Sequence, residues 1–315
     1  MILKKKFIIF FFVFIILLFW IFLKNYTLCN IFSDCSLTQD EYGGDLSKYV
    51  IHYYSNTIVN YYNIAPYVVF KFFHTWVSFE AFLFIFLMSF YSIIFFSGLN
   101  SIENKNQLKF LFFILIVAFY PFYDGYSTFA IKQGLGVIFL FVNFFLVKKV
   151  FSFTSWIFII LAILSHLVFL FFYLIFWISR YFSLKFLIFI YLLAITIYCL
   201  NINDTWFLNN INILYNLDLF FINDDILSKF NSESKLRFVI FSSLPLFSFL
   251  IPGFEKLIYE NELLKNLYQQ HFLYSSIVYL FLSEFYYIDR FLSLNWMFYP
   301  FYFLYLLRIV KFNKI

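Results

Sequence analysis

The sequence predicts an all-α, polytopic integral membrane protein with about ten transmembrane helices. Its 315 residues are 64% hydrophobic and only 12% charged, and the mean hydropathy is +0.87. Soluble domains carry about twice that share of charged residues. The apolar residues also gather in runs long enough to cross a bilayer, with polar segments between them. We therefore expect a single transmembrane domain over residues 1–315.

The first apolar run covers residues 7–23 and follows the cluster Lys4-Lys5-Lys6. This order is typical of a signal peptide, but no small-residue cleavage site follows the run. We expect a retained span with a cytoplasmic N-terminus, because cytoplasmic loops collect Lys and Arg. Further apolar runs cover residues 75–97, 108–122, 129–147, 151–178, 186–200, 238–251, 272–288 and 292–309.

The run 151–178 is too long for one straight span. A helix of its 28 residues would be about 42 Å long, against a hydrocarbon core of about 30 Å. Ser165-His166 interrupts the apolar residues, so we expect two short helices joined there, and ten spans in all. Both termini are then cytoplasmic, and the long polar segments 24–74 and 201–237 are external loops. The 14 of 22 cations on the cytoplasmic side are Lys4, Lys5, Lys6, Lys105, Lys109, Lys148, Lys149, Arg180, Lys185, Lys256, Lys265, Arg308, Lys311 and Lys314.

Lys132 and Gln133 begin one of these helices at its outer end. The free N–H groups and the dipole of a helix N-terminus favour an anion, so a phosphate group is the candidate ligand. A lysine that only reaches the lipid headgroups, or that pairs with Asp124, is the alternative. Gly134 and Gly136 would let a ligand or a neighbouring helix approach closely.

His166 lies at the break in the long run and is a candidate base, although a lone histidine among apolar residues is more often a hydrogen-bonded structural residue. Arg237 and Arg290 are candidate diphosphate ligands, since a guanidinium binds bidentately and stays charged. For Arg290, pairing with Asp289 or Glu284 is the rival interpretation.

Several function classes lack support in the sequence. It contains no metal-ligand spacing, phosphate-cradling glycine loop, nucleophile elbow or dinucleotide fingerprint. We therefore expect no metal, no cofactor and no nucleic-acid partner. The remaining groups are cations and an imidazole around an external, aromatic-lined cavity, which suits an anionic, lipid-linked ligand.

Four blocks resemble those of the EpsG-like and Wzy-type polysaccharide polymerases of bacterial envelopes. They occur in the family's order along most of the chain, and Lys132 stands where the family has Arg. The blocks are Gly44-Asp45-x-x-x-Tyr49-x-x-x-Tyr53, Ile131-Lys132-Gln133-Gly134-Leu135, Leu161-Ala-Ile-Leu-Ser-His166 and Tyr287-Ile-Asp-Arg290-Phe-Leu-Ser-Leu.

The resemblance implies a metal-independent glycosyltransferase of the C-type architecture, in the inner membrane of a bacterium. Such an enzyme joins undecaprenyl-diphosphate-linked oligosaccharide units into O-antigen, capsule or exopolysaccharide at the outer membrane face. By the same resemblance, His166 orients or deprotonates the attacking hydroxyl, and Asp45 is a second base or a sugar contact. The residues implied to bind the diphosphate and the rest of the substrate are Lys132, Gln133, Arg237, Arg290 and Tyr49.

The expected partners are the lipid-linked oligosaccharide, membrane lipid, a chain-length regulator and a flippase. Two other functions remain open at this point. A flippase or transporter would take the same lipid-linked sugar, but transporters usually carry internal repeats, which the sequence lacks. An O-antigen ligase would use a similar donor and scaffold with a different acceptor.

Overall fold

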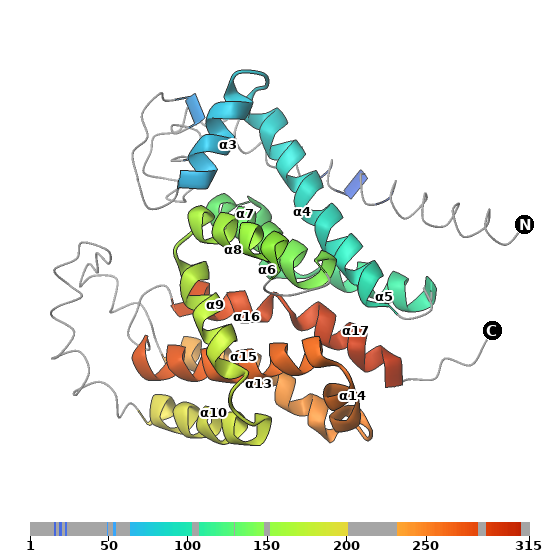
Figure 1. Cartoon of the computed structure of the whole chain (residues 1–315), viewed down its shortest axis with the longest axis vertical. Coiled ribbons are helices and arrows are strands. Elements are labelled where there is room, and N and C mark those ends of the chain that lie inside the picture. Colours follow the sequence, from blue (N-terminus) through green and yellow to red (C-terminus); the bar gives the residue numbers. More distant parts are fainter. Residues whose placement is uncertain are drawn as a thin grey trace, which may run out of the picture. The chain divides into compact units, whose positions relative to one another are not determined.

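The computed structural model describes residues 16, 19, 20, 23, 49, 53, 54, 64–102, 107–128, 130–147, 152–200, 232–282 and 288–309. Within these residues the regular structure is entirely helical, which confirms the all-α class (Figure 1). Asp45 and most of the two predicted external loops lie outside them. The chain forms two compact units, here called unit 1 (Met1–Asn100 and Tyr123–Phe169) and unit 2 (Ser101–Phe122 and Leu170–Ile315). The single transmembrane domain over 1–315 stays a prediction.

Unit 1 is organised around α7 (Ile131–Phe141), which is buried on nearly all sides and continues as a π-helical turn over Val142–Leu146. The helix packs against α8 and α3, and these two also contact each other. The other helices of unit 1 are α3 (Ile64–His74), α4 (Phe79–Ser101), most of α6 (Pro121–Thr128) and α8 (Phe153–Ser165).

Two contacts fix α7 and its π-turn against α8. The buried hydroxyl of Ser155 donates to Oδ1 of Asn143 at 2.6 Å, and the rings of Phe139 and Phe158 lie 6.3 Å apart. Residues further along α7 and its π-turn therefore contact residues closer to the start of α8. The two helices thus form an antiparallel hairpin.

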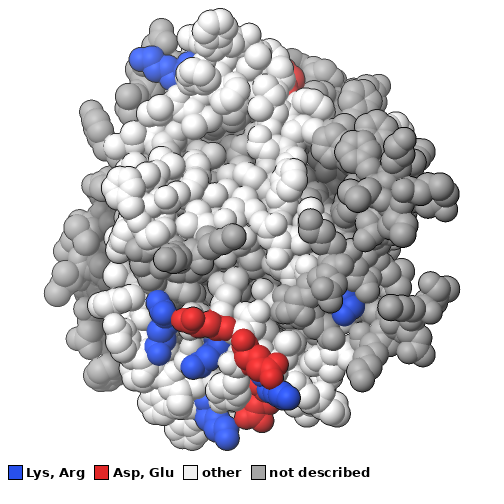
Figure 2. All heavy atoms as spheres, turned by 45° about the vertical axis from the view of Figure 1, so that its right-hand side comes forward, with Lys and Arg blue, Asp and Glu red and all other residues white. Residues whose placement is uncertain are grey.

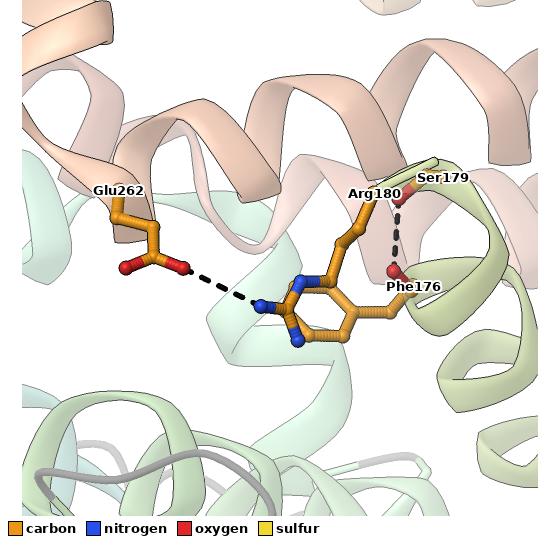
Figure 3. A network of polar contacts seen from close by, with 4 residues as sticks. All are labelled: Phe176, Ser179, Arg180 and Glu262. Carbon is orange, nitrogen blue, oxygen red and sulfur yellow. Dashed lines mark hydrogen bonds and ion pairs between the residues drawn. The ribbon is translucent and has the colours of Figure 1, made fainter. Parts of the chain in front are cut away.

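Unit 2 is built on the pair α10 (Leu184–Cys199) and α15 (Glu262–Phe281), which run side by side (Figure 1). Arg180 pairs with Glu262 at 3.4 Å beside the starts of the two helices (Figure 3), and Tyr198 meets Tyr279 near their ends, so they run parallel. The other helices are α5 (Gln107–Ala118), α9 (Val168–Ser179), α13 (Ser232–Phe247), α14 (Phe254–Glu260), α16 (Ile288–Trp296) and α17 (Tyr299–Ile309).

The lengths of the helices determine which of them could cross a membrane as a single span. Among the described residues, α4 alone is long and apolar enough to cross a bilayer as a single helix. The segment Lys235–Leu250 with α14 passes the same criterion together, although the two parts meet at 98°. The remaining apolar helices have 10–17 residues. The ten-span arrangement stays a prediction.

The helix boundaries confirm some expectations and correct others. The break in the run 151–178 is confirmed, because α8 ends at Ser165 and α9 begins at Val168. The run 108–122 was wrong as one helix, since α5 ends at Ala118 and α6 begins at Pro121. A proline disfavours helical geometry in the residue before it, which accounts for this break.

Three further boundaries depart from the apolar runs. The run 272–288 misses the first half of α15, which begins at Glu262 because the side chain of Asn261 accepts a hydrogen bond from the backbone N–H of Leu264 at 2.9 Å. The run 292–309 contains parts of two helices, α16 and α17. The predicted external loops 24–74 and 201–237 end in helical residues, those of α3 and of the first turns of α13.

Candidate functional site

The ammonium group of Lys132 lies among tyrosine side chains of unit 1. Its Nζ donates a hydrogen bond to the hydroxyl of Tyr67 at 3.1 Å and lies 4.8 Å from the centroid of that ring. The ring centroid of Tyr49 is 5.4 Å away. Both tyrosines are buried, whereas Lys132 is half-buried. A cation over aromatic faces gains attraction without losing its charge.

The described surroundings of Lys132 hold its charge in place without a neutralising carboxylate. Among the described residues, no carboxylate lies within ion-pair distance of its Nζ, and the side chain of Asp124 lies outside them. A partly desolvated charge favours a partner of opposite sign, because burial removes the water that would otherwise stabilise it. The site can therefore accept an anionic group.

The backbone at the start of α7 adds to this preference. α8, α10 and α15 each begin after a residue whose side chain accepts a backbone N–H, namely Ser152, Ser183 and Asn261. The corresponding residue of α7 is Ala130, which makes no side-chain cap. Among the described residues, the first N–H groups of α7 thus have no side-chain cap and, with the helix dipole, favour an anion beside Lys132.

Two glycines of α7 serve packing within the protein. A Cβ at Gly134 would lie 2.1 Å from the backbone oxygen of Tyr126, and a Cβ at Gly136 would lie 2.1 Å from Cε2 of Phe169. Of the two interpretations of these glycines, the close approach of neighbouring segments accounts for both. Gln133 is 6% exposed, and none of the described residues makes a hydrogen bond with its side chain.

His166 lies at the same end of the α7–α8 hairpin as Lys132. The antiparallel pairs Asn143–Ser155 and Phe139–Phe158 set the register. Following that register back along α7 and forward along α8 brings Lys132 level with His166, although the two residues are far apart in sequence. Lys132 and His166 thus occupy one region of unit 1.

The hydrogen bonding of His166 constrains its chemistry. The backbone N–H of Val168 donates to Nδ1 of the imidazole at 3.3 Å, which caps the start of α9. A nitrogen that accepts a hydrogen bond carries no proton, so the proton of the neutral ring is on Nε2. In this arrangement His166 presents an N–H donor rather than a basic nitrogen at Nε2.

A cluster of aromatic side chains borders Tyr49. The ring of Phe70 is 6.1 Å from that of Tyr49 and 6.0 Å from that of Tyr53. Burial raises the pKa of Tyr53 to about 12, with smaller contributions from Tyr54 and Glu80. The hydroxyl of Tyr53 therefore stays protonated near neutral pH and donates to the carbonyl of Val77 at 2.8 Å.

The described structure does not place the other predicted site residues, Arg237, Arg290 and Asp45, beside Lys132. Arg237 is exposed on α13 of unit 2, and Arg290 is in α16, with its side chain outside the described residues. Asp45 also lies outside them. Lys132, Gln133, Tyr49 and His166 belong to unit 1, so a clamp that joins Lys132 to the two arginines stays a prediction.

Sequence reasoning missed Tyr67, the closest partner of Lys132. It lies in the segment 24–74, which was expected to be a loop, and the chain contains 26 Tyr and 55 Phe. In such a composition a single tyrosine gives no signal. Its position in α3, which packs against α7, is what marks it.

Unit 2 holds its charged groups differently. Figure 2 shows cations and carboxylates gathered in one patch, with a largely uncharged described surface elsewhere in that view. Among the described residues of unit 2, Arg180 pairs with Glu262 at 3.4 Å and Lys256 with Glu260 at 3.6 Å. The carboxylates of both pairs are mostly exposed, as is Lys256. These cations already have carboxylate partners, so they are weaker candidates for an anionic substrate.

Among the described residues, no three His, Cys, Asp or Glu side chains lie together in a group able to hold a metal ion. Comparison with protein-family models, with curated proteins and with solved structures finds no match for this chain.

Proposed function

We propose that this chain is a membrane glycosyltransferase that joins undecaprenyl-diphosphate-linked oligosaccharide units into a polysaccharide at the outer face of a bacterial inner membrane. The observation that carries the proposal is the ammonium of Lys132, which is half-buried between Tyr49 and Tyr67 at an uncapped helix start. A diphosphate would supply a negative charge that none of the described residues brings to this group.

Aromatic rings suit the rest of such a donor. A lipid-linked sugar carries apolar C–H faces and a polyprenyl tail beside its diphosphate, and tyrosine offers both an apolar ring and a polar hydroxyl. The aromatic cluster around Tyr49, Tyr53 and Phe70 borders the position of the cation. Because these three rings are at most 5% exposed, the region supplies the charge for the diphosphate, and contact between the rings and the rest of the donor requires them to become more exposed.

The proposed reaction is a substitution at the anomeric carbon of the donor sugar. The acceptor hydroxyl forms a bond to this carbon, and the bond from the carbon to the diphosphate oxygen breaks. The diphosphate leaves with the electron pair, and Lys132 stabilises the charge that develops on it. Arg237 and Arg290 are the further diphosphate ligands that the family resemblance names.

His166 has a narrower role than the resemblance alone implies. Because Val168 donates to its Nδ1, its Nε2–H is suited to orient an acceptor or phosphoryl oxygen, and the ring is not arranged to remove a proton there. The hydroxyl proton then needs another acceptor. Asp45 is the carboxylate that the resemblance offers for this step.

The charges of unit 2 support the proposed membrane orientation. Arg180 and Lys185 lie at the start of α10 and were assigned to the cytoplasmic side. Lys235, assigned to the outer side, lies 5.4 Å from the ring of Tyr198 at the other end of the same helix. α10 has 16 residues and is about 24 Å long, which is shorter than a hydrocarbon core of about 30 Å. A span of this length requires a locally thinner bilayer.

Deleting the gene and complementing it with variants tests the proposal. We expect the deletion strain to accumulate single repeat units on the lipid carrier and to lose long polymer, as seen on gels of the envelope polysaccharide. Lys132→Ala should fail to restore polymer, and Lys132→Arg should restore it, because a guanidinium also binds phosphate. Normal polymer in the deletion strain would reject the proposed activity.

The matched control is Lys256→Ala, which removes a lysine that is paired with a carboxylate on the surface of unit 2. It should restore full-length polymer at a membrane abundance equal to that of Lys132→Ala. Equal amounts of polymer from the two alanine variants would argue against the Lys132 site. The proposed activity would then still be tested separately by the deletion strain.

A further inference from the structure

Three consecutive residues of α15 in unit 2 leave acceptor atoms unsatisfied in the protein interior. Gln269, Gln270 and His271 are at most 2% exposed. Among the described residues, Oε1 of each glutamine and Nδ1 of the histidine have no hydrogen-bond partner. Buried polar atoms in folded proteins are nearly always paired, with protein or with ordered water. A run of three such acceptors therefore indicates a feature beyond packing.

The tautomer of His271 follows from its one hydrogen bond. Its Nε2 lies 2.9 Å from the backbone oxygen of Ser242. A carbonyl oxygen only accepts, so Nε2 must carry the proton. In the neutral ring Nδ1 then has a lone pair that points into the interior and requires a donor.

Two tyrosine hydroxyls close to the imidazole already donate to backbone carbonyls. The rings of Tyr299 and Tyr302 lie 5.7 and 6.2 Å from the imidazole. The hydroxyl of Tyr299 donates to the carbonyl of Phe241 at 2.8 Å, and that of Tyr302 donates to the carbonyl of Leu267 at 3.1 Å. Neither can supply a proton to Nδ1 while these bonds persist.

The amides beside the histidine are used in the same way. The Nδ2 group of Asn295 donates to the carbonyl of His271 at 3.1 Å and to the hydroxyl of Ser275 at 3.0 Å. Nε2 of Gln270 donates to Oδ1 of Asn295 at 2.9 Å. The amide donors of Asn295 and Gln270 are thus directed elsewhere, and no described residue donates to Nδ1 of His271.

We propose that Nδ1 of His271 binds an internal water molecule in the core of unit 2. The ligand must donate a hydrogen bond, and the complete burial of His271 restricts it to a small molecule. Water satisfies both conditions, and buried waters typically pair with otherwise unsatisfied polar groups. The site is separate from Lys132 and does not depend on the proposed transferase activity.

The test is ¹⁵N NMR of the full chain labelled at histidine, in lipid nanodiscs. The triple variant His52→Gln, His74→Gln and His166→Gln leaves His271 as the single labelled residue without altering its neighbours. We expect an unprotonated Nδ1 with the chemical shift of a hydrogen-bonded acceptor, and magnetisation transfer to it from water protons. Both signals should persist when lipid-exposed water is suppressed by relaxation agents.

Three results would overturn the inference. A ¹⁵N chemical shift typical of an unprotonated Nδ1 without a hydrogen bond would mean that no water binds there. A hydrogen-bonded shift without transfer from water would identify a protein donor. A proton on Nδ1 would mean that the ring adopts the other tautomer. If the triple variant fails to fold, the wild-type spectrum with four histidines, assigned from the three single variants, gives the same readout.

Discussion

Lys132 in unit 1 and Arg180 in unit 2 are both cations close to helix starts, yet their surroundings differ. Arg180 reaches the exposed carboxylate of Glu262. Lys132 reaches the hydroxyl and ring of Tyr67 and the ring of Tyr49, with no carboxylate among its described neighbours. The charge of Arg180 thus has a carboxylate partner, whereas the described residues bring only aromatic rings and a hydroxyl to the charge of Lys132.

The difference shows how to separate a binding cation from a structural one in a chain with few charges. Position at a helix end is common to both residues and does not discriminate between them. The pairing state does, because an ion pair on the surface has already satisfied its charge.

Gly134→Ala should destabilise unit 1 most. Its Cβ would meet the backbone oxygen of Tyr126 at 2.1 Å, and a backbone atom cannot move aside as a flexible side chain can. We expect a loss at the upper end of overpacking effects, about 3 kcal/mol, because α7 must shift. The measurement is the midpoint of thermal unfolding in detergent, together with the yield of monodisperse protein.

Gly253→Ala in unit 2 is the matched control for that change. Gly253 has a φ of 83° and open space around its Cβ position, so only backbone strain opposes the substitution. We expect a smaller loss of about 1–2 kcal/mol. Equal unfolding midpoints for the two variants would show that α7 tolerates the added methyl group.

Tyr67→Ala should weaken donor binding by about tenfold, since it removes both the hydrogen bond and a ring that hold Lys132. Tyr67→Phe keeps the ring and should cost only about threefold to fivefold, the worth of one hydrogen bond. The measurement is KM for the lipid-linked donor in a membrane polymerisation assay. Identical KM values for Ala, Phe and wild type would exclude a positioning role for Tyr67.

The two amide replacements of His166 separate its two nitrogens. His166→Asn keeps an acceptor near Nδ1 for the Val168 N–H and loses the group at Nε2. His166→Gln keeps a donor near Nε2 and loses the cap. If the Nε2–H orients substrate, the polymerisation rate should be about tenfold higher in the Gln variant than in the Asn variant. The opposite order would assign His166 to capping α9.

Arg180→Ala should have the smallest effect. Its partner Glu262 is mostly exposed, and exposed ion pairs contribute less than about 1 kcal/mol. We expect unchanged polymer length and an unfolding midpoint within a few degrees of the wild type. A loss of polymer as large as that in Lys132→Ala would contradict the distinction between paired and unpaired cations.

The sequence located those features of unit 1 that depend on length and on rare residue types. The break at Ser165-His166 followed from a run too long for one span, and Lys132 stood out because charge is scarce. The antiparallel packing of α7 and α8 places Lys132 level with His166, next to this break. Helix ends set by local side chains were harder to find, such as the start of α15 after Asn261, since hydropathy does not register a cap.

Partners that come from distant segments had no sequence signal. Tyr67 contacts Lys132 only because α3 packs against α7, and an aromatic-rich composition hides which tyrosine does so. The network around His271 combines α13, α15 and α16, and its polar residues are ordinary when each helix is considered alone. Such pairings arise from tertiary packing, which spacing along one helix does not encode.

The hydrogen bond between Ser155 and Asn143 has an influence beyond its own location. It lies several turns from Lys132, where two apolar helices would otherwise slide with little penalty. A displacement by one turn would carry the lysine about 5.4 Å along its axis, away from the imidazole on the opposite helix. The relative position of Lys132 and His166, on which the proposed function depends, is thus set by a serine and an asparagine several turns away.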